Sequence, residues 1–324
     1  MKKVFLIFML AVLVLTSCTP KATISNKPFV FISPNKIHPV VRTMALGFWQ
    51  ACIALNVPCK DYSFDGVDFS KMAVSVDQVI AAGSPGAIAF VDKAVYAQDA
   101  KLIKAGIPVD AIHVQVAQGD VPGLLAWVAA DAGDYARNVA DFMGDKMGGK
   151  GTIALTQGDL NDVENLITAE FTKEMNTKYP NIKVLPPQME GFDPTAAIAV
   201  ASAILTAHPE ITAAYGTTGG SPTTWATALQ QAGRKPGDVI VAGMDYTLPN
   251  LDLVKSGWVT VLVAQPLYTE TYKALEILVA NSKGEKVDYA NVMPAPLVTI
   301  DNVQTYYDLV NRIDQVIPTP VPTP

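Results

Sequence analysis

The chain has 324 residues, of which 50% are hydrophobic and 17% are charged, and its formal net charge is −6 at pH 7. This length and composition suit about two globular domains and exclude disorder over most of the chain. The negative net charge and the lack of Lys/Arg clusters argue against nucleic acid as a partner.

The N-terminal 18 residues have the pattern of an export signal. Two lysines at positions 2 and 3 precede an apolar run over 4–15, which has the length typical of a signal peptide. The segment ends in Leu15-Thr16-Ser17-Cys18, which resembles the lipobox of bacterial lipoproteins, where the cysteine is lipidated and begins the mature chain. We therefore expect an exported protein anchored by Cys18 to the bacterial cell membrane, facing the periplasm or cell exterior, with 19–27 as a tether. An ordinary signal peptide that contains a cysteine is the alternative.

Short apolar runs alternate with segments of helical periodicity along the rest of the chain. In the first part, strands are expected at 29–33, 87–91 and 108–116, and helices at 40–55, 69–82 and 94–105. After a restart at 128–131, helices are expected at 134–147, 163–178, 196–207, 222–232, 250–256 and 269–281, and strands at 152–156, 182–186, 212–216, 239–242, 259–264 and 296–300. This alternation predicts βαβ units and an α/β fold with parallel sheets. A Thr- and Pro-rich tail is expected over 313–324.

Two cysteines remain after the signal, Cys52 in a predicted helix and Cys59 at the start of the following strand. An exported protein can form disulfides, but pairing requires the two Cα atoms to lie within a narrow distance window, so both outcomes stay open. Two thiols without a nearby histidine make a metal site unfavourable. The chain also lacks Gly-x-Ser-x-Gly and His-Glu-x-x-His motifs. We therefore expect no metal, no cofactor and no enzymatic activity.

Two polar residues, Asp245 and Gln265, follow the apolar runs at 239–242 and 259–264. In a parallel α/β sheet, ligands bind outside the carboxyl ends of the strands. A carboxylate and a carboxamide at these positions could orient a hydroxylated ligand, or they could simply cap the strand ends. His38 and His113 also follow strands, and each is either a ligand residue or a structural histidine.

Six short segments, in this order and spacing, resemble the type-I periplasmic binding proteins of ABC importers, in the ribose-binding or simple-sugar branch. The resemblance covers about 29–300 and follows a lipoprotein-like signal. The segments are AGIPV at 105–109, VAAD at 128–131, GGKG at 148–151, KYPNIKV at 178–184, VAGMD at 241–245 and AQP at 264–266.

This resemblance implies two Rossmann-like lobes with parallel sheets, joined by a three-strand hinge. The N-terminal lobe would comprise 28–130 and 266–296, and the C-terminal lobe 131–265 and 297–312. The ligand would bind in the cleft between the lobes.

The resemblance also implies ligand residues. The family's cleft aspartate falls on Asp245, its glutamine on Gln265, and its sugar-stacking aromatic on Phe192. Flat apolar sugar faces stack on such rings, although Phe192 could instead anchor its loop in the core.

Other family positions are changed in this chain. His38 lies in the first loop without the family's aromatic residues, His113 stands where an Asp-Arg pair is found, Thr218 replaces an asparagine, and Asn165 aligns loosely with an arginine. Losing the Asp-Arg pair removes charge-assisted hydrogen bonds, so we expect a ligand other than ribose.

The function implied by the resemblance is that of a monomeric solute receptor. It would bind a sugar, polyol or similar small molecule by hinge closure and present it to an ABC permease in the membrane. The alternatives are a ligand sensor for a chemoreceptor or sensor kinase, or a receptor for a nucleoside or other non-sugar solute.

Overall fold

The computed structural model describes residues 26–66, 70–90, 93, 95–158 and 162–318. The predicted signal peptide and its Cys18 lie outside these residues. Within the described part of the chain, no helix combines the length and apolar character needed to cross a bilayer.

The N-terminal lobe is built on a six-stranded parallel sheet with the strand order β12-β5-β4-β3-β1-β2. Its strands are β1 (Phe29–Ile32), β2 (Cys59–Asp61), β3 (Ala87–Phe90), β4 (Val109–Ile112), β5 (Ala126–Ala130) and β12 (Ala290–Met293). Its helices are α1 (Pro39–Leu55), α2 (Ser70–Ala82), α3 (Tyr96–Lys104) and α9 (Leu267–Ser282).

Helices cover both faces of this sheet, which explains the uninterrupted apolar run of β1. Phe29 and Phe31 pack with α1 and α9 on one face, and the rings of Phe31 and Phe48 lie 5.7 Å apart. Val30 and Ile32 pack with α2 and α3 on the other face. A parallel strand buried on both sides shows no alternation of apolar and polar residues.

The C-terminal lobe contains a seven-stranded sheet in the order β13-β11-β10-β9-β6-β7, with β8 paired to β6. Its strands are β6 (Gly151–Gln157), β7 (Ile182–Val184), β8 (Gln188–Met189), β9 (Ala213–Gly216), β10 (Ile240–Met244), β11 (Val261–Val263) and the antiparallel β13 (Leu297–Val298). Its helices are α4 (Ala132–Lys146), α5 (Asp162–Lys178), α6 (Pro194–Ala207), α7 (Ser221–Gln231) and α8 (Leu248–Lys255).

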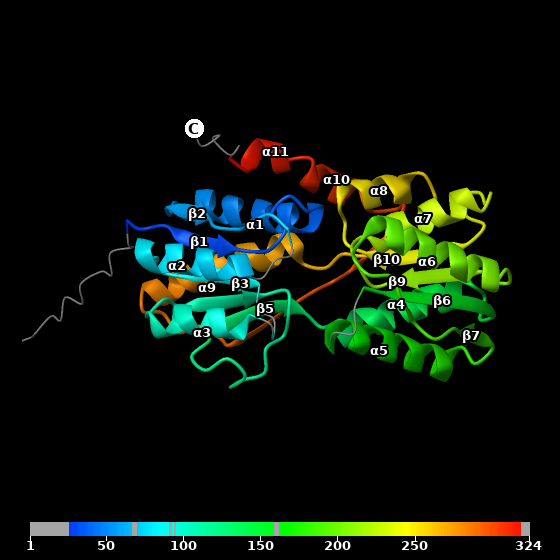
Figure 1. The fold of residues 1–324 in the computed structure, drawn as a ribbon, viewed down its shortest axis with the longest axis horizontal. Coiled ribbons are helices and arrows are strands. Elements are labelled where there is room, and N and C mark those ends of the chain that lie inside the picture. Colours follow the sequence, from blue (N-terminus) through cyan, green and yellow to red (C-terminus); the bar gives the residue numbers. More distant parts are fainter. Residues whose placement is uncertain (1–25, 67–69, 91–92, 94, 159–161, 319–324) are drawn as a thin grey trace, which may run out of the picture.

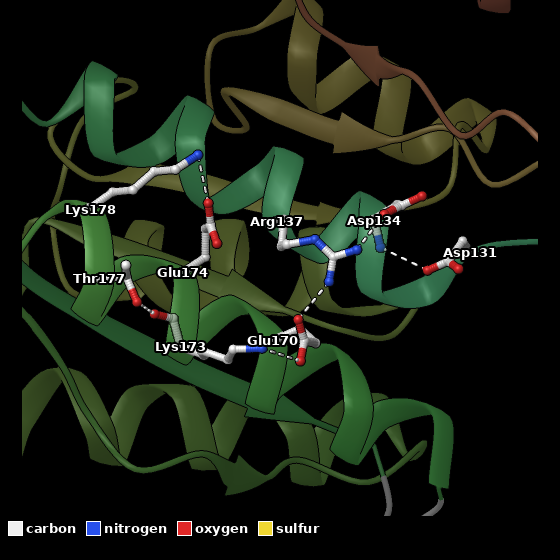
Figure 2. Close-up of polar contacts among 8 residues, drawn as sticks. All are labelled: Asp131, Asp134, Arg137, Glu170, Lys173, Glu174, Thr177 and Lys178. Carbon is white, nitrogen blue, oxygen red and sulfur yellow. Dashed lines mark hydrogen bonds and ion pairs between the residues drawn. The ribbon is translucent and has the colours of Figure 1, made fainter.

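The faces of this second sheet are also both covered. Ile153 and Leu155 pack with α4 and α5, whereas Ala154 packs with α6 and α7. Figure 2 shows how α4 and α5 are joined at their surface, where Nη1 of Arg137 donates to Oε2 of Glu170 at 2.5 Å. Such partly exposed ion pairs add little stability, so buried apolar contacts hold the two helices in place.

The chain passes between the two sheets three times (Figure 1). It leaves the N-terminal sheet after β5, returns from β11 into α9, and leaves again between β12 and β13. At the first passage, Asp131 caps α4 by accepting a hydrogen bond from the Asp134 backbone N–H at 2.9 Å. The predicted α/β fold of two lobes with largely parallel sheets is confirmed.

Several elements differ from the sequence prediction, which contains no strand at 126–130 or 188–189 and no helix at 303–310. The strand β12 was not expected, because its side chains are alternately exposed and half-buried at the edge of the sheet. The segment from 313, expected to be a tail, begins with the short helix α11 (Ile313–Val316). The preceding helix, α10 (Val303–Val310), packs on α8 of the C-terminal lobe, and α11 packs on α1 of the N-terminal lobe (Figure 1).

Cys52 and Cys59 are joined by a disulfide that links the last turns of α1 to the start of β2. Their Cα atoms lie 6.2 Å apart, inside the window that a disulfide requires.

Candidate functional site

Asp245 directly follows β10, at the carboxyl end of the central strand of the C-terminal sheet. Its φ of 67° places it in the left-handed region. The side chain of Asn250 supports this conformation, because its Nδ2 lies 3.0 Å from the carbonyl oxygens of Gly219, Met244 and Asp245. The loop therefore presents the Asp245 carboxylate from a fixed backbone.

The two lobes meet at this carboxylate. A Cβ on Gly219 would lie 2.6 Å from Oδ2 of Asp245 and 3.1 Å from Cγ2 of Val40, which belongs to α1 of the N-terminal lobe. Only glycine allows so close an approach at position 219. Asp245 is 3% exposed, and its Oδ1 has no hydrogen-bond partner among the described residues.

The N-terminal lobe contributes His113 and Glu270 to the same place. Nδ1 of His113 lies 3.3 Å from Oε1 of Glu270, which is fully buried in the first turn of α9. The positive end of the α9 dipole stabilises the negative charge of Glu270. Within the described part of the chain, Oε2 of Glu270 has no hydrogen-bond partner.

The charges of these three groups are coupled. Burial raises the pKa of Asp245 from its ordinary value of 3.8 to about 7, with His113 lowering it and Glu270 raising it further. Burial by itself lowers the pKa of His113, but the charge and hydrogen bond of Glu270, together with the charge of Asp245, raise it overall. The site therefore favours a protonated imidazole beside Glu270.

Gln265 lies between β11 and α9, at the second passage between the lobes. Its side chain is hydrogen-bonded to the hydroxyl of Tyr135 on α4. Tyr135 is 2% exposed, and its pKa is raised by burial first and then by neighbouring groups that include Asp245. We refer to Asp245, His113, Glu270, Gln265 and Tyr135 as the interlobe site.

Thr218 directs its hydroxyl into the C-terminal lobe. Its Oγ1 donates to Oε1 of Glu190 at 3.0 Å and lies 2.9 Å from Oγ of Ser221, which also donates to Glu190. Burial raises the pKa of Glu190, although hydrogen bonds from Ser221, Thr156 and Thr218 oppose the shift. The Thr218 hydroxyl, which was expected to bind ligand, is therefore hydrogen-bonded within this buried network.

The remaining sequence candidates have different environments. Nδ1 of His38 accepts a hydrogen bond from the Val40 backbone N–H at 3.3 Å and caps α1, and burial lowers the His38 pKa. Asn165 is exposed and accepts a hydrogen bond from Nε2 of Gln157 at 3.1 Å. Phe192 is 66% exposed and lies against Gly158 beyond β6, so it does not anchor its loop in the core.

Within the described residues, the candidates lie neither at a cluster suited to a metal ion nor in the apolar surface hollow of the C-terminal lobe. In the described ranges, no three His, Cys, Asp or Glu side chains are grouped so as to hold a metal ion. A hollow of about 300 Å³ on the C-terminal lobe is lined by residues such as Leu185, Ile204 and His208. It is apolar and contains none of the residues of the interlobe site.

Comparison with known sequences decides the family. Residues 29–286 match the periplasmic binding protein domain. The chain belongs to this family. The sequence motifs therefore indicated the correct family, and this prediction is confirmed for this periplasmic binding protein.

Two curated relatives of this periplasmic binding protein are each 28% identical to it. The xylitol-binding protein of Mycolicibacterium smegmatis matches over 239 residues, which span 73% of this chain and 67% of the relative. The ribose import binding protein of Salmonella typhimurium matches over 184 residues, which span 57% of this chain and 60% of the relative.

Solved structures show the same fold at lower identity. A sugar-binding protein of a sugar ABC transporter from Bacillus halodurans superposes with a TM-score of 0.80 at 20% identity, covering 87% of this chain and 100% of that one. A solute-binding protein from Actinobacillus succinogenes 130z, solved with D-allose, gives 0.78 at 20% identity and covers 86% and 100%.

Sequence reasoning missed Glu270, Tyr135 and Glu190. Glu270 and Tyr135 both lie in helices. In these helices a charged residue usually indicates a solvent-facing position and an aromatic residue a core position, so neither residue indicates a ligand site. The available signal for Glu270 was its place in the first helical turn, five residues after Gln265.

Proposed function

We propose that this periplasmic binding protein is the solute receptor of an ABC import system and binds a sugar or polyol in the interlobe site. The observation that carries the proposal is the meeting of Asp245 from one lobe with His113 and Glu270 from the other. Its relatives named for xylitol and ribose, and the fold shared with an allose-bound protein, support a polyhydroxylated ligand. Members of this family are binding proteins, which supports a receptor rather than an enzyme.

The proposed mechanism is hinge closure on the ligand. Donor groups of the ligand bind Oδ1 of Asp245 and Oε2 of Glu270, which have no partner among the described residues. The Gln265 amide binds a further hydroxyl, and the exposed ring of Phe192 stacks on an apolar sugar face. Because these groups come from both lobes, the ligand stabilises the closed form, which the permease then recognises.

The receptor is proposed to act as a monomer tethered to the membrane through a lipid on Cys18. Substituting Cys18→Ala should abolish incorporation of a radiolabelled fatty acid and release the protein from the membrane fraction. Retained lipid labelling in this variant would contradict the anchor.

A thermal-shift screen of sugars, polyols and nucleosides tests the receptor function. A ligand present at 100 times its Kd should stabilise the protein by about 2.7 kcal/mol. The function is supported if a sugar or polyol raises the melting temperature of the parent by more than it raises that of Asp245→Ala. A response to nucleosides alone, or to none of the three classes, contradicts it.

A further inference from the structure

Two buried carboxylate oxygens in the interlobe site have no hydrogen-bond partner within the described residues. They are Oδ1 of Asp245 and Oε2 of Glu270, on side chains that are 3% and 0% exposed. An unpaired buried carboxylate oxygen is strongly unfavourable. One oxygen comes from each lobe, and both residues act electrostatically on His113. A single ligand group that donates to both oxygens would relieve both of them.

The interlobe site holds more acidic groups than basic ones. The charged groups that shift the pKa of Asp245 are His113 and Glu270, so two carboxylates face one imidazole. The arginines, which serve as carboxylate partners in many sites, have their contacts elsewhere. Arg42 pairs with Asp314, Arg137 pairs with Asp134 and Glu170, Arg234 donates to the carbonyl of Pro209, and Arg312 acts electrostatically on Tyr268. His113 can carry one positive charge against these two carboxylates, and burial raises the pKa of Asp245 to about 7, so a ligand cation beside Asp245 would favour its ionised form.

We propose that the interlobe site selects a ligand that carries a protonated amine beside its hydroxyls, namely an amino sugar or amino polyol. This inference rests on the proposed receptor function and narrows its ligand class. An ammonium group has three N–H donors and no acceptor. It can therefore donate to more than one carboxylate oxygen and bring a positive charge beside the two acids. A neutral hydroxyl has one donor and brings no positive charge.

The neutral polar groups of the site suit the rest of such a ligand. Gln265 and the hydroxyl of Tyr135 can each donate and accept hydrogen bonds, so they match hydroxyls. The preference for an amine is thus assigned to the two carboxylates alone. Removing the charge of either one should lower the preference without a change in the shape of the site.

The test compares matched pairs of neutral and amine-bearing probes by calorimetry at neutral pH. The pairs are D-glucose with D-glucosamine, sorbitol with 1-amino-1-deoxysorbitol, and xylitol with 1-amino-1-deoxyxylitol. In at least one pair, the amine should bind the full parent chain about ten-fold more tightly than its neutral partner, which equals about 1.4 kcal/mol. In Glu270→Gln and in Asp245→Asn, this ratio of affinities should fall to near one, whereas His208→Ala should retain it.

The two substitutions keep the proposal testable if one of them prevents folding, since they lie in different lobes. If neutral probes bind and no amine binds more tightly, the amine preference is wrong while the receptor function stands. If no probe of either kind binds, the amine preference is wrong, and the wider thermal-shift screen decides the receptor function. A preference that persists in Glu270→Gln and Asp245→Asn also overturns the proposal.

Discussion

Asp245 illustrates how one residue can combine strain, burial and charge at a single position. Its left-handed backbone, its 3% exposure and an Oδ1 without a hydrogen-bond partner among the described residues are all unfavourable for an ionised carboxylate. Such features persist where the surrounding structure enforces them, and they concentrate at ligand sites. The Asn250 side chain provides that enforcement through its contacts with three carbonyl groups.

Replacing Asp245 by Ala should weaken binding of the solute found in the screen by about ten- to hundred-fold, because a hydrogen bond to a charged group contributes about 1.5–3 kcal/mol. Calorimetry on the purified variant measures this loss. His208→Ala is the matched control and should bind as the parent does, since His208 lies beyond α6 and contacts Glu210 instead. Parent-like affinity in Asp245→Ala would remove this residue from the site.

The stability of the unliganded protein should fall as pH rises toward 7. The pKa of Asp245 is about 7 in the folded state against an ordinary 3.8, so the unfolded chain loses this proton first, and stability declines across that window. The raised pKa of His113 acts in the same direction, because its stabilisation is lost as pH rises through its folded pKa. Glu270 and Tyr135 are the other titratable groups of the interlobe site.

Melting temperatures measured between about pH 5 and 8 check this expectation. In Asp245→Asn the decline should be shallower but not abolished, because burial also raises the pKa values of Asp99 and Glu190. A slope identical to that of the parent would show that Asp245 does not titrate in this range.

At the scale of elements, the disulfide fastens the C-terminal end of α1 to β2. Reducing it, or replacing Cys52 and Cys59 by serine, should lower the free energy of unfolding by about 2 kcal/mol for so short a loop. Ligand affinity should not change, because Cys52 is about 20 Å along α1 from the turn that faces the interlobe site. Urea unfolding of the two forms measures the difference. Mass spectrometry of unreduced protein that finds both thiols alkylatable would contradict the bond itself.

At the scale of the whole molecule, the helices α10 and α11 form a strap that bridges the lobes beside the three chain passages. The first helix packs on α8, and the second packs on α1 through Ile313 and an ion pair between Arg42 and Asp314 (Figure 1). Hinge opening must therefore displace α11 from α1 or bend the strap.

A chain that ends at residue 312 lacks α11 and should favour the open form. We expect its ligand affinity to fall several-fold and its unliganded radius of gyration to rise. Fewer contacts then stabilise the closed form that ligand binding requires. A chain that ends at residue 318 retains α11 and is the control. Small-angle scattering and calorimetry measure both quantities. Equal values for the two truncated chains would exclude a restraining role for the strap.

Much of this fold could be predicted, because apolar patterning is a local property of the chain. The run Phe29-Val30-Phe31-Ile32 is apolar at every position because both faces of its strand are covered, and such runs separated by helical segments indicate parallel α/β sheets. Asp245 and Gln265 were found because a residue that follows a buried strand must lie at that strand's carboxyl end. β12 was missed because an edge strand need not be apolar.

The sequence by itself determined most of the segments that become strands and helices, and which polar residues stand at strand ends. Only the tertiary structure decided which of those residues meet. His113 and Glu270 are 157 positions apart, and they touch because α9 of the N-terminal lobe follows the second passage between the lobes. Thr218 stands at a strand end as expected, yet its hydroxyl is taken by Glu190, 28 positions away. The partner of a polar group depends on packing between distant elements, and local periodicity carries no information about that packing.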